Sequence, residues 1–155
     1  MFDIFLARSE EDFEAAAKLF RQYAAEIPIA LDFQNFEEEL QQLQNVYAET
    51  LGGIILCKQN NIYIGCAGIR KLNADTAELK RMWIRPTARG KGLGEKILNA
   101  AVELAKSKNY KAIVLDTLDH MHPAIKLYKE AGFKETAPYY FNPHKNALYF
   151  KKIIG

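Results

Sequence analysis

The sequence is poor in the residues that mark specialised classes of protein. Two of its 155 residues are cysteine and five are proline, too few for a disulfide-stapled scaffold or a proline-rich linker. Neither sign of charge dominates, because 21 Lys and Arg face 19 Asp and Glu, and this balance argues against a non-specific nucleic-acid binder. No apolar run approaches the roughly 20 residues of a membrane span, and the first residues turn acidic too early for a signal peptide. We therefore expect a cytoplasmic protein without nucleic-acid or membrane partners.

The remaining composition is typical of a globular domain. Hydrophobic residues make up 49% of the chain and charged residues 26%, which disfavours intrinsic disorder. A chain of 155 residues has the length of one domain and can bury roughly two thirds of its extended surface. We expect a single domain over residues 1–155.

The two cysteines are expected to be reduced residues of the core. They lie in two strand-like runs that are joined by an Asn60-Asn61 turn. Pairing around that turn places Cys57 opposite Ile64 and Cys66 opposite Ile55, so the thiols are diagonal neighbours. Such neighbours lie about 7–8 Å apart, too far for an unstrained disulfide.

The spacing of apolar residues predicts a mixed α/β domain with the element order βααβββαβαβ. The expected strands cover 2–7, 54–58, 62–69, 77–84, 112–115 and 147–153, and the expected helices cover 9–27, 33–47, 93–105 and 123–131. Ser9 with Asp12 predicts a capping box at the first helix. In the second helix, an apolar stripe predicts that the acidic run 37–39 lies largely outside. The apolar last strand offers an edge for pairing across a homodimer.

The segment 85–94 is the strongest indication of a binding site in the sequence. It reads RPTARGKGLG, between a predicted strand and a predicted helix, and six basic residues face one acidic residue over 80–96. Glycines let a ligand approach the backbone closely, and a helix N-terminus presents free N–H groups. The segment therefore predicts a phosphate or pyrophosphate site, although a glycine-rich turn with solvated lysines would read the same way.

Two other phosphate-binding patterns fit this segment less well. The chain has no GxxxxGK[ST] run, which excludes a Walker A loop. A dinucleotide fingerprint would need a small third residue where Glu95 stands, and the loop lies in mid-chain. Asp116 does lie about twenty residues further on, as that fingerprint requires.

Two motifs indicate a family. Arg89, Gly92 and Gly94 satisfy [QR]xxGx[GA] after the predicted strand, and the segment 124–133, AIKLYKEAGF, fits AxxLYxxxGF about thirty residues downstream. Together they resemble the GNAT N-acetyltransferase superfamily. The resemblance covers residues 50–155 well and the first 50 only by element order. It implies a single-domain α/β (α+β) fold with a mixed, mostly antiparallel central sheet, a V-shaped splay between the strands 77–84 and 112–115, and flanking helices.

The resemblance implies acetyl-CoA as co-substrate and no metal. Its pantetheine arm would lie against the backbone of Met82 and Ile84, its pyrophosphate on the amides of 89–94, and its 3′-phosphate near Arg89 and Lys91. The full implied set of cofactor-binding residues is Met82, Trp83, Ile84, Arg89, Gly90, Lys91, Gly92, Leu93, Gly94, Thr117, Met121 and Tyr128.

This sequence departs from the family at Met121, where many relatives carry an Asn that donates a hydrogen bond; a thioether cannot donate. His120 and His122 flank it, and we interpret them as helix-entry residues rather than metal ligands.

The implied chemistry is attack by a neutral amine on a thioester carbonyl. An amine with a pKa near 10 is mostly protonated at pH 7, so a proton acceptor is needed. Glu78 matches the family's base, although a solvated carboxylate at a strand end is an equal alternative. Tyr128 matches the residue that protonates the leaving thiolate, and its alternative is a packed core aromatic. A backbone N–H near Met82 would stabilise the oxyanion.

The acceptor is expected to bind between the segments 27–33 and 138–144. Arg81 is a candidate for a substrate carboxylate if it turns inward, and Tyr139 and Tyr140 are candidate pocket residues. Small amines, amino acids, and the N-termini and lysines of peptides or proteins are all open alternatives for the acceptor. A non-catalytic acyl-CoA-binding domain is the alternative to the enzyme, and a nucleotide-binding module is a third hypothesis.

Overall fold

The computed structural model describes residues 1–27, 33–140, 142 and 144–155. Within these residues the strands are β1 (Asp3–Leu6), β2 (Gly53–Gln59), β3 (Ile62–Lys71), β4 (Thr76–Ile84), β5 (Ala112–Leu118), β6 (Lys134–Thr136) and β7 (Ala147–Ile153). The helices are α1 (Glu10–Glu26), α2 (Phe33–Gln41), α3 (Leu43–Val46), α4 (Leu93–Ser107) and α5 (His122–Glu130), with a short 3₁₀ turn η1 (Pro86–Ala88) after β4.

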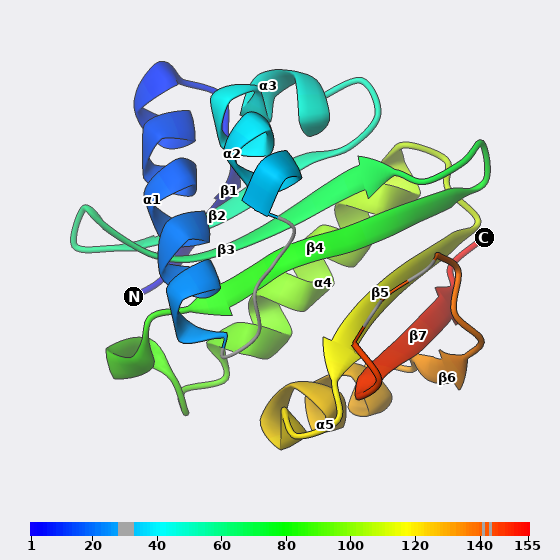
Figure 1. The fold of residues 1–155 in the computed structure, drawn as a ribbon. Helices are drawn as coiled ribbons and strands as arrows, with labels where there is room; N and C mark the ends of the chain where they lie inside the picture. Colours follow the sequence, from blue (N-terminus) through cyan, green and yellow to red (C-terminus); the bar gives the residue numbers. More distant parts are fainter. Residues whose placement is uncertain (28–32, 141, 143) are drawn as a thin grey trace.

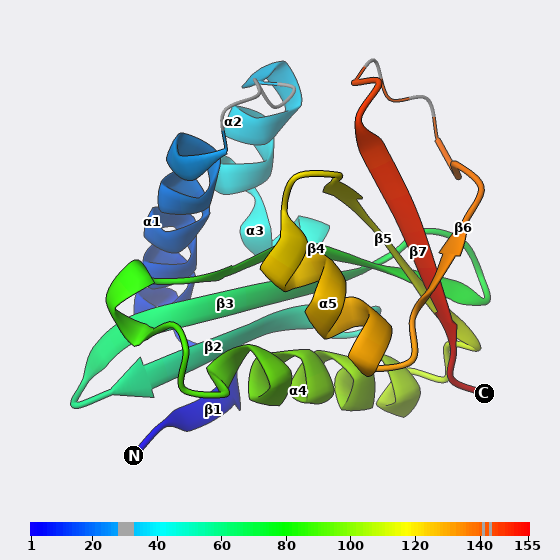
Figure 2. The same cartoon turned by 90° about the horizontal axis from the view of Figure 1, so that it is seen from below.

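The strands form one sheet in the order β1-β2-β3-β4-β5-β7-β6. Neighbouring strands are antiparallel except β4 and β5, which are parallel. Helices α1, α2 and α3 cover one face, and α4 and α5 lie on the other (Figures 1 and 2). Each face has its own apolar core, built around Phe20 and Tyr47 on the α1 side and around Ile97 and Phe150 on the α4 side. The expected mixed, mostly antiparallel sheet with flanking helices is confirmed.

The parallel strands β4 and β5 separate after a short stretch of pairing. Their paired residues are Thr76 with Ala112, Ala77 with Ile113, and Glu78 with Val114. Beyond these pairs the two strands diverge (Figure 2), while β5 stays paired with β7 along its whole length. The predicted V-shaped splay is therefore present, and β4 from Leu79 onward has no strand partner on its β5 side within the described residues.

A β-bulge interrupts β4 at the start of this splay. Lys80 lies opposite Gly68 and Trp83 opposite Cys66, so two residues of β4 face one residue of β3. Arg81 takes up the bulge with a φ of 59°, in the left-handed region. Because a bulge breaks the alternation of side chains, the direction of Arg81 does not follow from the strand pattern.

Helix α1 begins as the sequence predicts. The Ser9 hydroxyl accepts a hydrogen bond from Asp12 N at 3.0 Å, and the Asp12 carboxylate accepts one from Ser9 N at 3.2 Å. The second predicted helix is instead divided into α2 and α3 at Gln42. The sequence also missed β6, because three residues are too short to show a period of two.

The predicted register of the cysteines was wrong by one residue. A register shift between Cys57 and Lys58 places Cys57 opposite Gly65 and Cys66 opposite Leu56. The two thiols therefore lie on opposite faces of the sheet, one in each apolar core. Both are free and buried, so the prediction that they are reduced core residues is confirmed.

The last strand is not an edge. β7 lies between β5 and β6, and its residues 149–151 pair on both sides. A second copy cannot pair with this part of β7, because β6 already occupies its hydrogen-bonding edge. None of the helices in the described ranges is long and apolar enough to cross a bilayer.

Candidate active site

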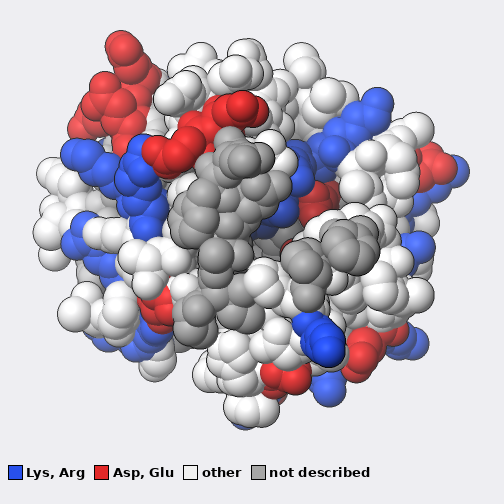
Figure 3. Space-filling view, in the orientation of Figure 1, with Lys and Arg blue, Asp and Glu red and all other residues white. Residues whose placement is uncertain are grey.

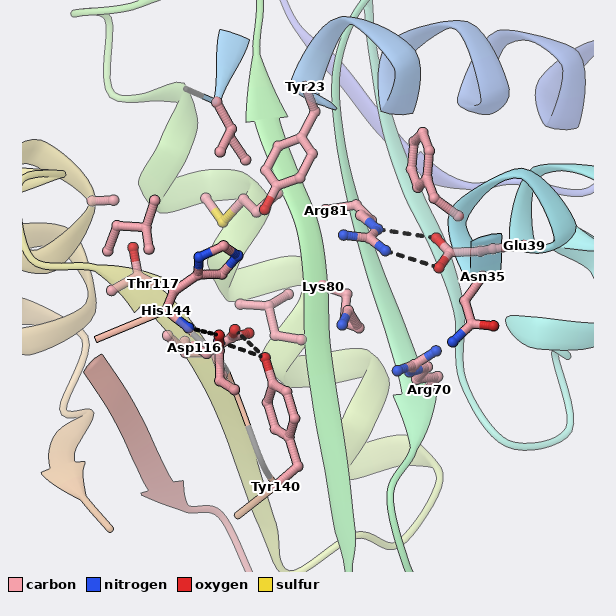
Figure 4. A pocket seen from close by; sticks show the side chains of 18 of the residues that line it. Tyr23, Asn35, Glu39, Arg70, Lys80, Arg81, Asp116, Thr117, Tyr140 and His144 are labelled. Atoms are coloured by element: carbon pink, nitrogen blue, oxygen red, sulfur yellow. Dashed lines mark hydrogen bonds and ion pairs between the residues drawn. The ribbon is translucent and has the colours of Figure 1, made fainter. Parts of the chain in front are cut away.

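A cavity of about 940 Å³ lies where β4 and β5 separate. Its walls come from α1, α2, β3, β4, β5, α5 and the segment before β7 (Figure 4). In the space-filling view, basic and acidic side chains meet in a recess near the middle of this face (Figure 3). Its polar lining residues are Tyr23, Asn35, Glu38, Glu39, Gln42, Arg70, Lys80, Arg81, Asp116, Thr117, Tyr128, Tyr140, Asn142 and His144.

Arg81, the candidate for a substrate carboxylate, lines the cavity, but a buried carboxylate binds its guanidinium. Its Nε and Nη2 atoms donate to the two oxygens of Glu39, each at 3.0 Å. The guanidinium also lies 5.0 Å from the ring centre of Phe36 and 5.8 Å from that of Tyr23. The guanidinium of Arg81 is thus already bound to Glu39 of α2 and is not free to bind a substrate.

Glu39 is buried, with 7% of its surface exposed, so the expectation that residues 37–39 lie outside is wrong for this residue. Arg81 and the Tyr47 hydroxyl, which donates to Glu39 at 3.0 Å, satisfy the carboxylate. Burial alone would raise the pKa of Glu39, but the hydrogen bonds and charge of Arg81 outweigh it and hold the pKa below its usual value. The sequence pattern missed Glu39 because its partner lies 42 residues away.

Glu78 lies beside the cavity rather than on its surface. It is 3% exposed and does not line the cavity. Arg70 Nε donates to its Oε1 at 3.0 Å, and the Tyr139 hydroxyl donates to its Oε2 at 2.8 Å. Burial and the neighbouring Glu78 charge raise the pKa of Tyr139. Tyr139 thus contacts the predicted base rather than the cavity.

Two basic residues that the sequence reasoning missed line the cavity next to Glu78. Arg70 lies opposite Glu78 on β3, and Lys80 follows two residues later on β4. Lys80 Nζ lies 3.8 Å from Glu78 Oε2, longer than a hydrogen bond. Burial lowers the pKa of Lys80, the charge of Glu78 opposes this, and those of Arg81 and Arg70 add to it. The sequence analysis predicted no register between the strands 62–69 and 77–84, so it did not indicate the Arg70–Glu78 pair.

The β5 wall carries an acid that the sequence reasoning had not assigned to the site. Asp116 lines the cavity, and the Tyr140 hydroxyl donates to its Oδ2 at 2.5 Å. Asn142 Nδ2 in turn donates to the Tyr140 hydroxyl at 3.1 Å. Tyr140, a candidate pocket residue from the sequence, also lines the cavity. Of the predicted walls, residues 28–32, Phe141 and Pro143 lie outside the described residues.

Tyr128, the predicted acid, lines the cavity from α5 and is 8% exposed. Its ring packs 6.0 Å from that of Phe133 and 6.3 Å from that of Phe150. Burial, together with Tyr23 and the charge of Asp116, raises the pKa of Tyr128, so its hydroxyl keeps its proton at neutral pH. Tyr23 of α1, which the sequence reasoning missed, lines the same cavity (Figure 4).

The glycine loop forms an open cradle at the start of α4. Gly90 and Gly92 have φ of 80° and 78°, and Gly92 is the N-cap of the helix. A Cβ at either position would meet no atom within 4 Å, so the backbone is open to a ligand. At Gly94 a Cβ would instead lie 3.3 Å from Leu127, and Leu93 is 1% exposed. These two residues pack the helix, and Leu93 presents only its backbone to the loop.

Side chains beside the loop form a cluster on Glu26, the last residue of α1. Arg89 Nη2 and Trp83 Nε1 donate to Glu26 at 2.7 and 2.6 Å, and Arg89 Nε donates to Ile84 O at 2.8 Å. These hydrogen bonds, led by that of Arg89, outweigh burial and lower the pKa of Glu26. Lys91 is exposed.

At the β5 end of the cavity, Thr117 Oγ1 donates to the sulfur of Met121 at 3.7 Å, and both residues line the cavity. Met121 is the N-cap of α5, with Pro123 in the first turn. His120 and His122 are exposed beside it. The described part of the chain contains no group of three or more potential metal-binding side chains.

Residues 13–133 match the acetyltransferase (GNAT) family model. An uncharacterized N-acetyltransferase of Schizosaccharomyces pombe is 32% identical over 91% of this chain and 88% of that protein. The chain belongs to the GNAT family and is an N-acetyltransferase, which confirms the resemblance.

Solved structures share the fold. A GNAT acetyltransferase from Staphylococcus aureus superposes with a TM-score of 0.83 at 21% identity, over 99% of both chains. A protein from Salmonella typhimurium, determined with its cofactor acetyl-CoA, gives a TM-score of 0.75 at 16% identity, over 99% of this chain and 94% of that one. These likenesses show that the fold is shared.

Proposed function

We propose that this protein transfers the acetyl group of acetyl-CoA to the primary amine of a small molecule, amino acid or peptide, by direct attack in a ternary complex. The observation that carries the proposal is the cavity at the splay of β4 and β5, which has Tyr128 on one wall and Asp116 on another. A proton donor and a proton acceptor thus face one space that two substrates can enter.

The residues around the splay fit acetyl-CoA. The β4 edge beyond Glu78 has no strand partner on its β5 side within the described residues, so an extended ligand could lie along Met82 and Ile84. The Ile84 carbonyl oxygen already accepts from Arg89 Nε. The N-terminus of α4 suits a pyrophosphate, because Gly90 and Gly92 leave the backbone there open. Of the amides of 89–94, that of Arg89 already donates to Pro86 O. Arg89 and Lys91 are the proposed partners of the 3′-phosphate, with Arg89 exchanging Glu26 for it. When bound, acetyl-CoA supplies an activated thioester.

The chain's own residues would carry out two proton transfers, one from the acceptor ammonium and one to the departing sulfur. The acceptor arrives as an ammonium ion and must lose a proton to react. Glu78 is the candidate from the sequence and Asp116 the candidate that lines the cavity; both oxygens of Glu78 already have partners. Tyr128, which keeps its proton at neutral pH, would donate one to the departing sulfur.

The experiment is acetyl-CoA binding followed by transfer. The melting temperature is measured with acetyl-CoA, ATP and NAD, since a ligand at 100 times its Kd adds about 2.7 kcal/mol to stability. Thiol release is then followed with a panel of amines. We expect a shift with acetyl-CoA alone and turnover with at least one amine. No shift at millimolar acetyl-CoA would overturn the proposal, and binding without any turnover would favour an acyl-CoA-sensing domain.

A further inference from the structure

The ion pairs beside the cavity are unequally shared. Three cations, Arg70, Lys80 and Arg81, meet two carboxylates, Glu39 and Glu78, in direct ion pairs. Both oxygens of Glu39 accept from Arg81 in a two-point contact. Glu78 is left to pair with both Arg70 and Lys80, while Glu38, the other acid that lines the cavity from α2, is exposed.

The two cations that share Glu78 are also incompletely hydrogen-bonded. Arg70 uses its Nε for Glu78, and its Nη atoms have no hydrogen-bond partner among the described residues. Lys80 Nζ is only within ion-pair distance, 3.8 Å, of Glu78, although just 15% of its side chain is exposed. The ammonium group of Lys80 is thus held by charge at a distance, and its N–H donors can serve a ligand or water in the cavity. Both side chains line the cavity (Figure 4).

The opposite wall has the complementary charge. Asp116 faces the cavity from β5, on the other side of the opening from Lys80 and Arg70 (Figure 4). The Tyr140 hydroxyl donates to one of its oxygens, which leaves the other available to a donor. The cavity therefore has a cationic wall and an anionic wall.

We propose that the acceptor is a small zwitterion, an amine that also carries a carboxylate, with its carboxylate bound by Arg70 and Lys80 and its ammonium at Asp116. A free α-amino acid is the simplest such molecule. A planar carboxylate can accept from the Nη atoms of Arg70 and from Lys80 at once. Arg81 holds α2 in place through Glu39 and is not the carboxylate ligand. This inference rests on the proposed acetyl transfer and narrows its acceptor class.

The first test compares each of the twenty amino acids with its own amide, as acceptors for the wild-type protein. The amide keeps the amine and the side chain but lacks the negative charge. Its amine is also less basic, so without carboxylate recognition the amide is the better nucleophile at pH 7. We expect the best amino acid to exceed its amide at least tenfold in kcat/KM. Equal or faster reaction of the amides would overturn the inference.

The second test removes one cation. Lys80→Met keeps the length of the side chain and loses its charge, and we expect the preference for acid over amide to fall at least tenfold. Lys71→Met, at the exposed end of β3, is the matched control and should keep the preference. Calorimetric titration of the same amino acid into the CoA-saturated protein gives a readout independent of turnover, and binding should weaken at least tenfold in Lys80→Met. Unchanged binding would overturn the role of Lys80.

The two levels of the proposal fail differently. Absence of acetyl-CoA binding overturns the proposed function. Binding of acetyl-CoA with transfer only to amines that lack a carboxylate, or with no transfer to any amino acid, overturns the zwitterion and leaves the cofactor assignment intact. If Lys80→Met does not fold, the comparison of acids with amides in the wild-type protein decides alone.

Discussion

Arg81 and Glu39 form a buried two-point ion pair that joins the bulge of β4 to helix α2. Both hydrogen bonds are 3.0 Å long, and the side chains are 10% and 7% exposed. The pair fixes one wall of the cavity to the sheet. Because its guanidinium donates to Glu39, Arg81 is not free to bind a substrate, although it lines the cavity.

Breaking this pair should be costly, because either variant leaves a buried charge without its partner. We expect Arg81→Met and Glu39→Gln each to lower the free energy of unfolding by about 3 kcal/mol, and the double variant to lose less than the sum. Urea unfolding measures all three. The exposed pair Arg21–Glu37 joins α1 to the same helix α2, and its removal should cost less than about 1 kcal/mol. Additive losses at Arg81 and Glu39 would contradict a coupled pair.

Gly92→Ala should weaken acetyl-CoA binding at least tenfold, because the added methyl group occupies the open cradle. The positive φ also strains the variant by about 1–2 kcal/mol. Gly132→Ala is the control: its φ is 93°, and its Cβ would meet only the Lys152 side chain, at 3.6 Å. Both variants should lose similar stability by thermal unfolding, and calorimetry should detect lost affinity only in Gly92→Ala. Equal affinity in the two variants would remove the cradle from the cofactor site.

Tyr128→Phe should lower kcat by about 10²- to 10⁴-fold, the usual contribution of a general acid. Because the hydroxyl is lost and the packed ring is kept, the Kd for acetyl-CoA should stay within about threefold. Tyr110→Phe is a matched change away from the cavity, where the hydroxyl donates to Leu51 O; it should cost about 1 kcal/mol of stability and leave kcat unaltered. A Tyr128→Phe enzyme with wild-type kcat would assign the tyrosine to packing.

The two candidate bases can be separated by pH. Asp116→Asn and Glu78→Gln are each assayed from pH 6 to 10 with one amine. Loss of the true base should be largest at low pH and shrink as the pH approaches about 10, where the amine deprotonates without help. A deficit that stays constant with pH indicates a positioning role. We expect the pH-dependent deficit from Asp116→Asn, and a constant deficit from both variants would exclude both carboxylates as the base.

Asp12 should make the free energy of unfolding depend on pH in the acidic range. Burial would raise its pKa, but hydrogen bonds from the Arg8 and Ser9 amides and the Tyr63 hydroxyl lower it below the ordinary 3.8. A depressed folded-state pKa contributes stability that is present above the unfolded value and is lost as the pH falls through the folded value. Asp12→Asn should therefore cost about 1 kcal/mol at pH 7 and progressively less below pH 4. A difference that does not shrink in acid, in urea unfolding, would contradict this.

Local signals in the sequence predicted the frame of the site. The capping box at Ser9 and the glycine cradle depend on neighbours within a few residues, so both can be predicted from a short stretch of sequence. The splay of β4 from β5 came from the family resemblance, and the register of the pairing now places it after Glu78. Tyr128 and Tyr140, two candidates from the sequence, both line the cavity.

The charged residues on the two walls of the cavity could not be predicted, because their positions depend on contacts between segments that are distant in the sequence. The bulge at Arg81 breaks the alternation from which side-chain direction is inferred. Glu39 shares an acidic run with two exposed neighbours, and only its contact with Arg81 distinguishes it. Asp116 faces a cavity that exists only because two distant strands separate. None of these facts has a signature within one helix or strand.

The location of these charges limits how this protein can change over evolutionary time. Arg70, Lys80 and Arg81 belong to β3 and β4, adjacent strands in the middle of the sheet, and their ion pairs help to hold the fold. Tyr140 and Asn142, on the other wall, lie outside any strand or helix. Mutations on the cationic wall therefore alter folding and recognition together, while mutations on the other side alter recognition at little cost to folding. New acceptor preferences should arise first in the segment before β7.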